Sequence, residues 1–122
     1  MNVLLSSKQL ADLIEKVVKR KPTDKIHPAT RIFQALRIAV NDELNSLKEA
    51  PPQALEILEP NGKIIVITFH SLEDKIIKDF CHSELESESA INLTPEPIRP
   101  SEDEIYDNPR SRSAKLKALE KK

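Results

Sequence analysis

Lys63-Ile64-Ile65-Val66-Ile67-Thr68-Phe69 is the stretch that decides the fold of this 122-residue chain. Every residue after the lysine is β-branched or aromatic, and polar and apolar residues do not alternate. This pattern predicts a strand covered on both faces, as in a parallel sheet. A turn signal, Pro60-Asn61-Gly62, precedes the strand. The residues after His70-Ser71 predict a helix over residues 72–81 with three inward apolar side chains, Ile76, Ile77 and Phe80.

Two helices are predicted upstream of this strand. Ser6 and Gln9 match the capping-box spacing, apolar residues follow at helical intervals through residue 18, and Pro22 ends the helix. Pro28 suits the first turn of a longer helix that runs to about Lys48. Its apolar stripe predicts one continuous buried face: Ile32, Phe33, Leu36, Val40, Leu44 and Leu47. The pair Pro51-Pro52 predicts an end or a kink, with a further turn or two over residues 53–58.

After the helix predicted over residues 72–81, residues 82–107 show no hydrophobic periodicity and contain three prolines. They predict a long, partly mobile loop. The final stretch alternates small or apolar residues with Ser and Lys, which favours an edge strand, although its composition also suits a helix. Helix, strand and helix in succession indicate an α/β fold. Because a stable sheet needs about three strands or more, the chain is predicted to be a piece of a larger sheet protein.

Composition narrows the class of protein. Apolar residues make up 39% of the chain, charged residues 32%, and the formal net charge is −1. The charged residues between 84 and 107 are all acidic except for Arg99, whereas most charged residues from Arg110 onward are basic. A basic end of this kind permits contact with phosphate without requiring it. A single cysteine, Cys81, excludes an internal disulfide and a cysteine metal cluster. The sequence contains no signal peptide and no stretch of transmembrane length, so we expect a cytoplasmic protein with no membrane partner.

A polar stripe on the longer helix is the first candidate site. Arg31, Gln34, Arg37 and Asn41 follow one another at helical spacing beside the apolar stripe. Their fork-like hydrogen-bonding groups suit phosphate or base edges. The alternative, which we favour at this point, is that they are internal struts that tie the helix to neighbouring loops.

The residues at the carboxyl end of the predicted strand are the second candidate site. Ligands of open α/β sheets bind beyond the carboxyl ends of strands, which gives His70 and Ser71 functional weight. The competing interpretation is structural, because Ser71 and Asp74 have capping-box spacing. Adjacent His and Ser residues are poorly placed for a catalytic triad, and a metal site formed with His82 is not expected.

The third candidate is the basic segment over residues 108–115. Arg110 and Arg112 occupy alternate positions between small residues, a spacing that could follow a phosphate backbone. A solvated edge strand explains the same pattern equally well. The absence of interleaved aromatic residues argues against a stacking platform for single-stranded RNA.

Three strings in this order resemble one family. They are HPATRIFQALRIAVNDEL over residues 27–44, FHSLED over residues 69–74 with Lys78, and NPRSRSAKL over residues 108–116. Together they look like the C-terminal portion of the RsmH (MraW) family. That family contains S-adenosylmethionine-dependent methyltransferases that modify N4 of a cytosine in the decoding region of small-subunit (16S) ribosomal RNA. The resemblance spans almost the whole chain.

The resemblance implies a Rossmann-like methyltransferase fold interrupted by a helical insertion. Residues 1–24, with a helix from Leu4 to Lys21, correspond to the last helix of the insertion, and residues 25–122 to the C-terminal half of the methyltransferase domain. The strand over residues 63–69 returns to the main sheet, and the tail from Arg110 is its closing antiparallel strand. The chain departs from the family at Asn61, where glycine is usual, at Pro51-Pro52 in a normally regular helix, and at Lys75 in place of arginine.

The family's glycine-rich donor-binding loop is expected upstream of Met1. This chain has one glycine, Gly62, so we expect it to bind no S-adenosylmethionine alone and to be inactive alone. Its catalytic residues stay unknown. Its implied partners are small-subunit ribosomal RNA and, as a separate chain, the missing N-terminal half. The residues expected to contact RNA are Arg31, Arg37, Asn41, His70, Ser71, Arg110 and Arg112.

Two alternatives stay open at this point. The chain could be a non-catalytic RNA-binding or ribosome-associated remnant, for which the basic C-terminal segment is the motive. It could also be a decayed product with no role, which would expose the apolar faces of its helices and behave as a molten state.

Overall fold

The computed structural model describes residues 6–23 and 25–122, and the chain divides into two compact units with a boundary after Asp42. The predicted helix start at Leu4 and the predicted domain boundary at residue 24 lie outside the described residues. Each unit is described separately. None of the helices in residues 6–23 and 25–122 has the length and apolar character needed to cross a membrane.

The first unit consists of two helices, α1 (Ser7–Val17) and α2 (Ala29–Asn41). The predicted capping box is confirmed, because the Ser6 hydroxyl accepts a hydrogen bond from the Gln9 amide at 3.2 Å and the Gln9 side chain accepts one from the Ser6 amide at 3.1 Å. Ile14 and Ala29 are the buried apolar residues in the described part of this unit.

The predicted extent of the longer helix is wrong. Helix α2 ends at Asn41, because Asp42 adopts the left-handed conformation with φ of 51°. The continuous buried face is also wrong for this chain, because Val40 is 82% exposed and Leu36 is 47% exposed. Within the described part of the first unit only the short helix α1 packs against α2, which leaves much of the apolar stripe exposed.

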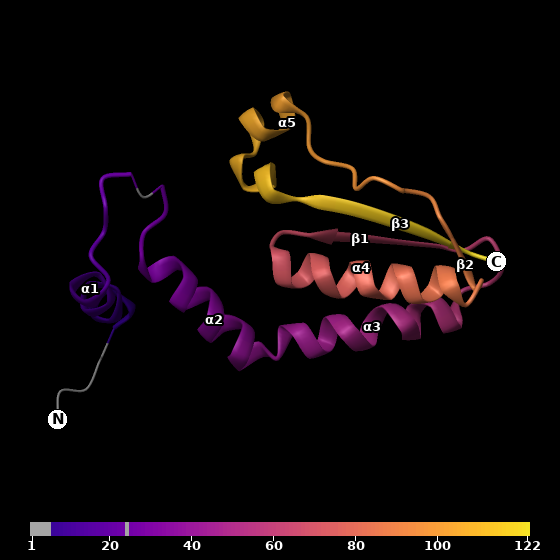
Figure 1. Ribbon diagram of the computed structural model, residues 1–122, viewed down its shortest axis with the longest axis horizontal. Coiled ribbons are helices and arrows are strands. Elements are labelled where there is room, and N and C mark those ends of the chain that lie inside the picture. The colour runs from indigo at the N-terminus through magenta and orange to yellow at the C-terminus, as the bar shows by residue number, and fades with distance from the viewer. Residues whose placement is uncertain (1–5, 24) are drawn as a thin grey trace. The chain divides into compact units, whose positions relative to one another are not determined.

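The second unit begins with α3 (Glu43–Ile57), β1 (Lys63–Thr68) and α4 (Ser71–Glu86). The prolines at 51 and 52 lie inside α3, so of the two predicted outcomes, an end or a kink, the end is wrong. Proline removes a backbone donor and crowds the preceding turn, so the helix needs support from elsewhere. Helix α3 packs along α4, and Pro51 is buried, so tertiary packing offsets the local cost (Figure 1).

The remaining elements of the second unit are β2 (Ala90–Asn92), α5 (Glu102–Asp107), the 3-10 helix η1 (Pro109–Ser113) and β3 (Lys115–Lys121). The loop predicted over residues 82–107 is therefore wrong in most of its length. Helix α4 continues to Glu86, and Ile98 forms a β-bridge with Leu116. The Ser101 hydroxyl caps α5 by accepting from the Glu104 amide at 3.2 Å. A three-residue strand is too short to show a period, which explains why sequence periodicity missed it.

The strands form an antiparallel sheet in the order β1-β3-β2. The predicted closing strand is antiparallel as expected, but it begins at Lys115, after η1, and it is the middle strand of this sheet. It is central because β1 pairs with one of its edges, while β2 and the bridge at Ile98 pair with the other edge, which the alternating pattern predicts to be solvated. The chain is thus a mixed α/β protein with a small antiparallel sheet.

Strand β1 differs from the prediction of a parallel strand covered on both faces. Its only hydrogen-bonded neighbour among the described residues is the antiparallel strand β3. Helices α3 and α4 pack on one face, while Ile65 is 63% and Ile67 is 53% exposed on the other. The predicted parallel neighbours are not among the described residues, so one edge and one apolar face of β1 are left open. The core lies beneath the covered face, where Ile77 is 1% and Leu119 is 2% exposed.

Candidate functional site

The junction between β1 and α4 is held by a reciprocal cap. His70 is the N-cap of α4, and its Nδ1 accepts a hydrogen bond from the Glu73 amide at 3.3 Å. Glu73 Oε2 in turn accepts one from the Phe69 amide at 2.8 Å. The predicted capping pair of Ser71 and Asp74 is therefore wrong, because the helix starts at Ser71, one residue earlier than that pairing requires. The strand-like backbone of His70 (φ −142°, ψ 166°) places its ring over the first turn.

This cap restricts what His70 can do chemically. Its Nδ1 is an acceptor, so this nitrogen carries no proton in the capped state. Its Nε2 is buried and lies 3.3 Å from Glu73 Oε1, but the two atoms do not form a hydrogen bond. Protonation of Nδ1 would remove the cap from α4. His70 is consequently a positioning residue of the junction in this structure.

A carboxylate that two lysines share lies one helical turn further along α4. Lys117 Nζ is 3.3 Å from Asp74 Oδ1, and Lys115 Nζ is 3.5 Å from Asp74 Oδ2. The side chains of Lys117, Asp74 and Lys115 are only 11%, 17% and 29% exposed. Burial alone would raise the pKa of Asp74, but the two ammonium groups outweigh it and hold the pKa below its ordinary value of 3.8. One carboxylate cannot neutralise two lysines, so the cluster keeps a positive charge.

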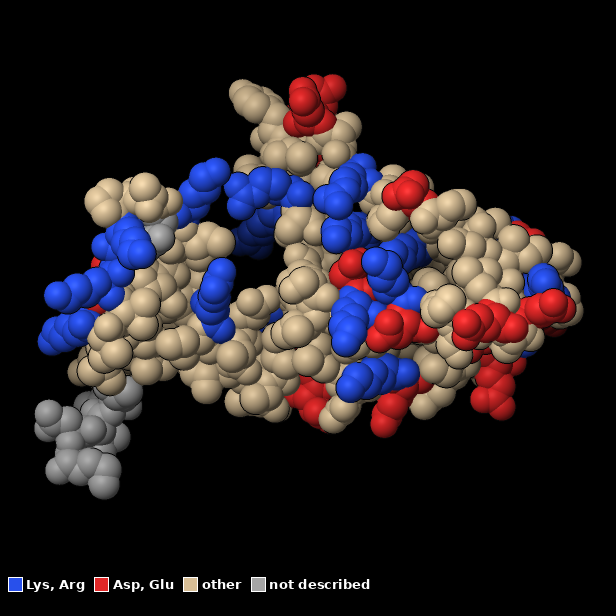
Figure 2. Space-filling model, in the orientation of Figure 1, with Lys and Arg blue, Asp and Glu red and all other residues tan. Residues whose placement is uncertain are grey.

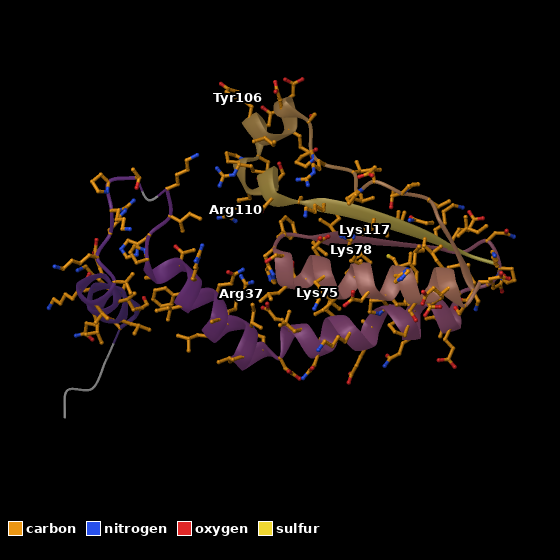
Figure 3. The ribbon with its side chains drawn as sticks, in the orientation of Figure 1. Arg37, Lys75, Lys78, Tyr106, Arg110 and Lys117 are labelled. Carbon is orange, nitrogen blue, oxygen red and sulfur yellow. The ribbon has the colours of Figure 1, made fainter. Side chains whose placement is uncertain are left out.

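Two hollows open beside this cluster. The smaller, of about 220 Å³, lies at the carboxyl end of β1 and is lined by Thr68, His70, Ser71 and Ser113, among others. The larger, of about 660 Å³, runs between α4 and the segment of residues 92–99, and it includes Cys81, whose thiol pKa is raised mainly by burial. Arg99 and Lys115 line both hollows. Figure 3 shows Lys78 and Lys117 near each other on this side of the unit.

Charge is unevenly placed over the second unit. Figure 2 shows Lys and Arg side chains gathered over α4 and the start of β3, with some acidic side chains among them, whereas the top of α5 is acidic. The acidic residues there are Glu102, Asp103 and Glu104. No group of three or more His, Cys, Asp or Glu side chains in the described part of the chain is placed to hold a metal ion.

The predicted site residues fall in three places. Arg31, Arg37 and Asn41 are exposed on α2, in the first unit. His70 and Ser71 line the smaller hollow of the second unit. Arg110 and Arg112 are exposed in η1, not on a strand as the alternating pattern predicted. Helix η1 ends at Ser113, which also lines the smaller hollow, so the structure brings the second and third candidates together. The roles of all seven residues stay predictions.

The cations that the structure adds to this site are Lys78, Arg99, Lys115 and Lys117. Lys115 belongs to the basic segment of residues 108–115 that the sequence indicated, but Lys78, Arg99 and Lys117 were not proposed from sequence as ligand-binding residues. One signal was available, because Arg99 is the only basic residue in the acidic stretch of residues 84–107. Hydrophobic periodicity could not have placed Arg99 beside Lys115, because their proximity depends on the β-bridge between Ile98 and Leu116, and the segment around Ile98 has no periodic pattern.

Comparison with known proteins decides the family. The sequence profile of the MraW methylase family matches residues 1–122. The chain belongs to the MraW methylase family. This membership confirms the resemblance on which three motifs in the sequence had already converged.

Relatives named "Ribosomal RNA small subunit methyltransferase H" share about half of its residues. The protein of Thermomicrobium roseum is 46% identical over 93% of this chain and 39% of its own length. The protein of Leptospira borgpetersenii is 48% identical over 98% of this chain and 38% of its own length. The protein of Coprothermobacter proteolyticus is 45% identical over 97% of this chain and 39% of its own length. The chain thus spans about two fifths of these relatives.

The residues present do not fit the methyl donor that the MraW family implies. A glycine-rich loop lets the backbone approach such a ligand closely. The one glycine of the sequence, Gly62, lies in the turn before β1, where its amide donates to the Glu59 carbonyl at 2.9 Å. That turn is at the opposite end of β1 from the smaller hollow. We therefore assign no donor-binding role to this chain's residues.

Proposed function

We propose that this chain forms the C-terminal part of a Rossmann-like, S-adenosylmethionine-dependent methyltransferase that modifies N4 of a cytosine in the decoding region of small-subunit (16S) ribosomal RNA. Family membership and the shared name of the relatives support the reaction. In this proposal residues 1–24 end a helical insertion and residues 25–122 belong to the methyltransferase domain. Because ribosomal RNA is modified where ribosomes assemble, the proposal implies a cytoplasmic protein.

The observation that carries the proposal is the open side of the sheet. The register places Ile65 opposite Ala118 and Ile67 opposite Leu116, so these side chains share the face of the sheet that α4 does not cover. Leu93 and Ile98 extend this uncovered face across β3, at 42% and 56% exposed. An exposed apolar sheet face can bind another polypeptide, and an unpaired strand edge beside it can pair with a further strand.

The proposed occupant of the uncovered face and of the open β1 edge is the donor-binding part of the same methyltransferase. The relatives are more than twice as long as this chain, so they contain polypeptide enough for it. This part could be a separate chain or could be joined to the present one. Since the residues described here do not fit the donor, methyl transfer in this proposal requires that polypeptide.

The chain's own contribution is to bind and orient RNA. His70 and Ser71 would form one wall of the cleft, fixed by the cap on α4. The guanidinium groups of Arg31, Arg37, Arg110 and Arg112 and the amide of Asn41 would contact phosphate or base edges, for which their planar donors are suited. Orientation of the target against the donor supplies a large share of the rate acceleration in a group transfer of this kind.

A chimera tests the proposal directly. The segment of the Leptospira borgpetersenii relative that aligns with this chain is replaced by the 122 residues, and transfer of a labelled methyl group to unmethylated small ribosomal subunits is measured. We expect the chimera to methylate the cytosine that the parent enzyme methylates. A chimera that folds, as judged by its melting curve, and binds the donor but leaves that cytosine unmodified would refute the proposal. The isolated chain should show no donor binding by calorimetry.

A second candidate function is RNA binding without catalysis. Its support is that Arg110 and Arg112 are exposed and that, in the part of the chain the structure describes, neither forms an ion pair. Exposed arginines on a short helix suit a phosphate backbone without base reading. The chimera separates the two candidates, because the remnant would bind ribosomal RNA in a salt-dependent way in isolation but would not support methyl transfer when joined to a donor-binding part.

A further inference from the structure

A row of three side chains crosses the sheet at the carboxyl end of β1. Thr68 of β1 pairs with Lys115 of β3. On the other edge of β3, Ile98 pairs with Leu116 through two hydrogen bonds of 2.9 Å, so the antiparallel register brings Arg99 opposite Lys115. Directly opposed residues share a face of the sheet. Lys115 reaches Asp74 of α4, so this row lies on the α4 side.

The smaller hollow at this row has a cationic lining. Arg99 and Lys115 both line it, together with Ser71 and Ser113, and no carboxylate of the described residues does. Glu73 accepts from the Phe69 amide, and Asp74 is shared by Lys115 and Lys117, so its single charge offsets only one of the two ammonium groups. In the described part of the chain no carboxylate lies within ion-pair distance of Arg99, which is exposed. The hollow therefore carries positive charge that the chain does not neutralise.

Phosphate is the ligand class that this lining suits. A guanidinium offers a planar fork of donors, and an ammonium adds a second positive charge. Two serine hydroxyls can donate to the remaining oxygens. The hollow also lies at the start of α4, a helix of 16 residues whose positive end favours an anion. A volume of about 220 Å³ holds one phosphate group with part of its ribose, not an extended ligand.

The neighbouring charges favour a phosphodiester of RNA over a free anion. Helix η1 ends at Ser113, so its exposed arginines, Arg110 and Arg112, precede the hollow along the chain (Figure 3 labels Arg110). Lys78 lines the larger hollow on the other side of Arg99 and Lys115. Cations thus continue on both sides of the proposed pocket. A strand of RNA presents phosphates in such a series, whereas an isolated phosphate would need only the one pocket.

We propose that Arg99 and Lys115, with the hydroxyls of Ser71 and Ser113, bind one phosphate of the RNA backbone in the smaller hollow. The identity of the RNA rests on the proposed function. Asp74 positions Lys115 and Lys117 in this arrangement without touching the phosphate. The phosphate contact fixes where the RNA strand passes the carboxyl end of β1 and carries no base specificity of its own.

Salt-dependent RNA binding by the full 122-residue chain tests this site. Fluorescence anisotropy measures the affinity for a labelled hairpin from the decoding region between about 50 and 200 mM salt, for wild type and for Arg99→Gln/Lys115→Gln. For Arg99→Gln/Lys115→Gln we expect binding about tenfold weaker than wild type at the lowest salt concentration. The slope of log K against log salt should be smaller in magnitude by about 1. The matched control Lys63→Gln/Lys122→Gln removes the same charge at the far end of the sheet and should change affinity less than about twofold.

A variant that preserves both charges separates loss of the phosphate contact from loss of folding. Arg99→Lys/Lys115→Arg is this variant, and it should retain the wild-type slope. The proposal is overturned if the glutamine pair binds like wild type, if the lysine control loses as much, or if an acidic peptide of equal charge displaces the hairpin as well as unlabelled RNA does. Absence of any RNA binding by wild type overturns it as well. A chimera that methylates with an unchanged KM for RNA after Arg99→Gln/Lys115→Gln refutes this site and leaves the proposed function standing.

Discussion

Replacing Asp74 by asparagine should be the most damaging single polar substitution in the second unit. The change removes the carboxylate that Lys117 and Lys115 share while keeping the size of the side chain. Exposed ion pairs contribute about 0–1 kcal/mol, and breaking a fully buried one costs about 3–5 kcal/mol. With Lys117 only 11% exposed, the cluster lies between these limits, so we expect a loss of about 2 kcal/mol. For a unit of this size that corresponds to a fall in Tm of roughly 10 °C.

Urea unfolding of the full chain, followed by circular dichroism, measures this loss. Asp79→Asn is the matched control, because it makes the same chemical change on the same helix at an exposed position and should cost less than about 0.5 kcal/mol. The double variant Asp74→Asn/Lys117→Met should recover much of the loss. The reason is that most of the penalty comes from leaving a nearly buried ammonium without its counter-charge, and methionine removes that charge.

The pH dependence of the same variant has a definite sign. The pKa of Asp74 is held below its ordinary value of 3.8 in the folded chain, so the unfolded chain binds the proton more readily. Its contribution to stability is therefore full above about pH 4 and is lost as pH falls through the folded pKa. The stability difference between wild type and Asp74→Asn should be constant from neutral pH down to about pH 5 and should shrink below pH 4.

Two results would refute this reasoning. One is an Asp74→Asn variant as stable as Asp79→Asn, which would show that the cluster contributes no more than a surface pair. The other is an Asp74→Asn/Lys117→Met variant whose loss equals the sum of the two single losses, because independent contributions are incompatible with a shared charge penalty.

Four other substitutions or reactions test separate features. Glu73→Ala removes the carboxylate that accepts from the Phe69 amide and should cost about 1 kcal/mol in urea unfolding, against less than about 0.5 for Glu86→Ala at the exposed end of α4. Gly62→Ala should cost about 1–3 kcal/mol, because the added Cβ would lie 2.8 Å from the hydrogen-bonded Glu59 carbonyl oxygen; an unchanged melting temperature would contradict this. Ile67→Lys should change the unfolding free energy of the isolated chain by less than about 1 kcal/mol and reduce its aggregation, yet abolish folding or activity of the chimera; equal tolerance in both would argue against docking at the uncovered face. Iodoacetamide should alkylate Cys81 more slowly at pH 8 than it does in urea, because burial raises the pKa of this thiol above its ordinary value of 9.0; equal rates would contradict that.

The elements with a strong local signal were predictable from sequence. The strand over residues 63–69 matches β1 to within one residue, because consecutive β-branched residues leave few other conformations. The capping box at Ser6 was also confirmed, since it depends on two side chains three residues apart. Features of this kind are decided within one turn of chain, so a single sequence contains all the information they need.

The errors arise where distant packing overrides a local signal. Proline at 51 and 52 is a reliable helix breaker in isolation, yet α3 continues through both because it packs on α4. The break came instead at Asp42, a residue with no strong breaking signal other than its tolerance of the left-handed conformation. Strand β2 exists because β3 offers it an edge, which no pattern within residues 90–92 could indicate.

The candidate site was predicted in part for the same reason. His70 and Ser71 could be found because they follow a buried strand directly. Arg99 could not, because its position beside Lys115 depends on the bridge between Ile98 and Leu116, in a segment that has no period. Charge offered a hint that spacing did not, since a lone arginine among acidic residues is conspicuous in the sequence.

The proposed docking surface and the proposed phosphate pocket lie on opposite faces of one sheet. Lys115 and Lys117 point to α4, whereas Leu116 and Ala118, between and beyond them on the same strand, belong to the uncovered face. Alternation along β3 therefore separates the cationic hollows from the apolar docking surface by the thickness of the sheet. A donor-binding polypeptide that covers Ile65 and Ile67 would leave the phosphate pocket open. We therefore expect RNA and that polypeptide to bind this chain without competition, so that addition of one leaves the affinity for the other undiminished.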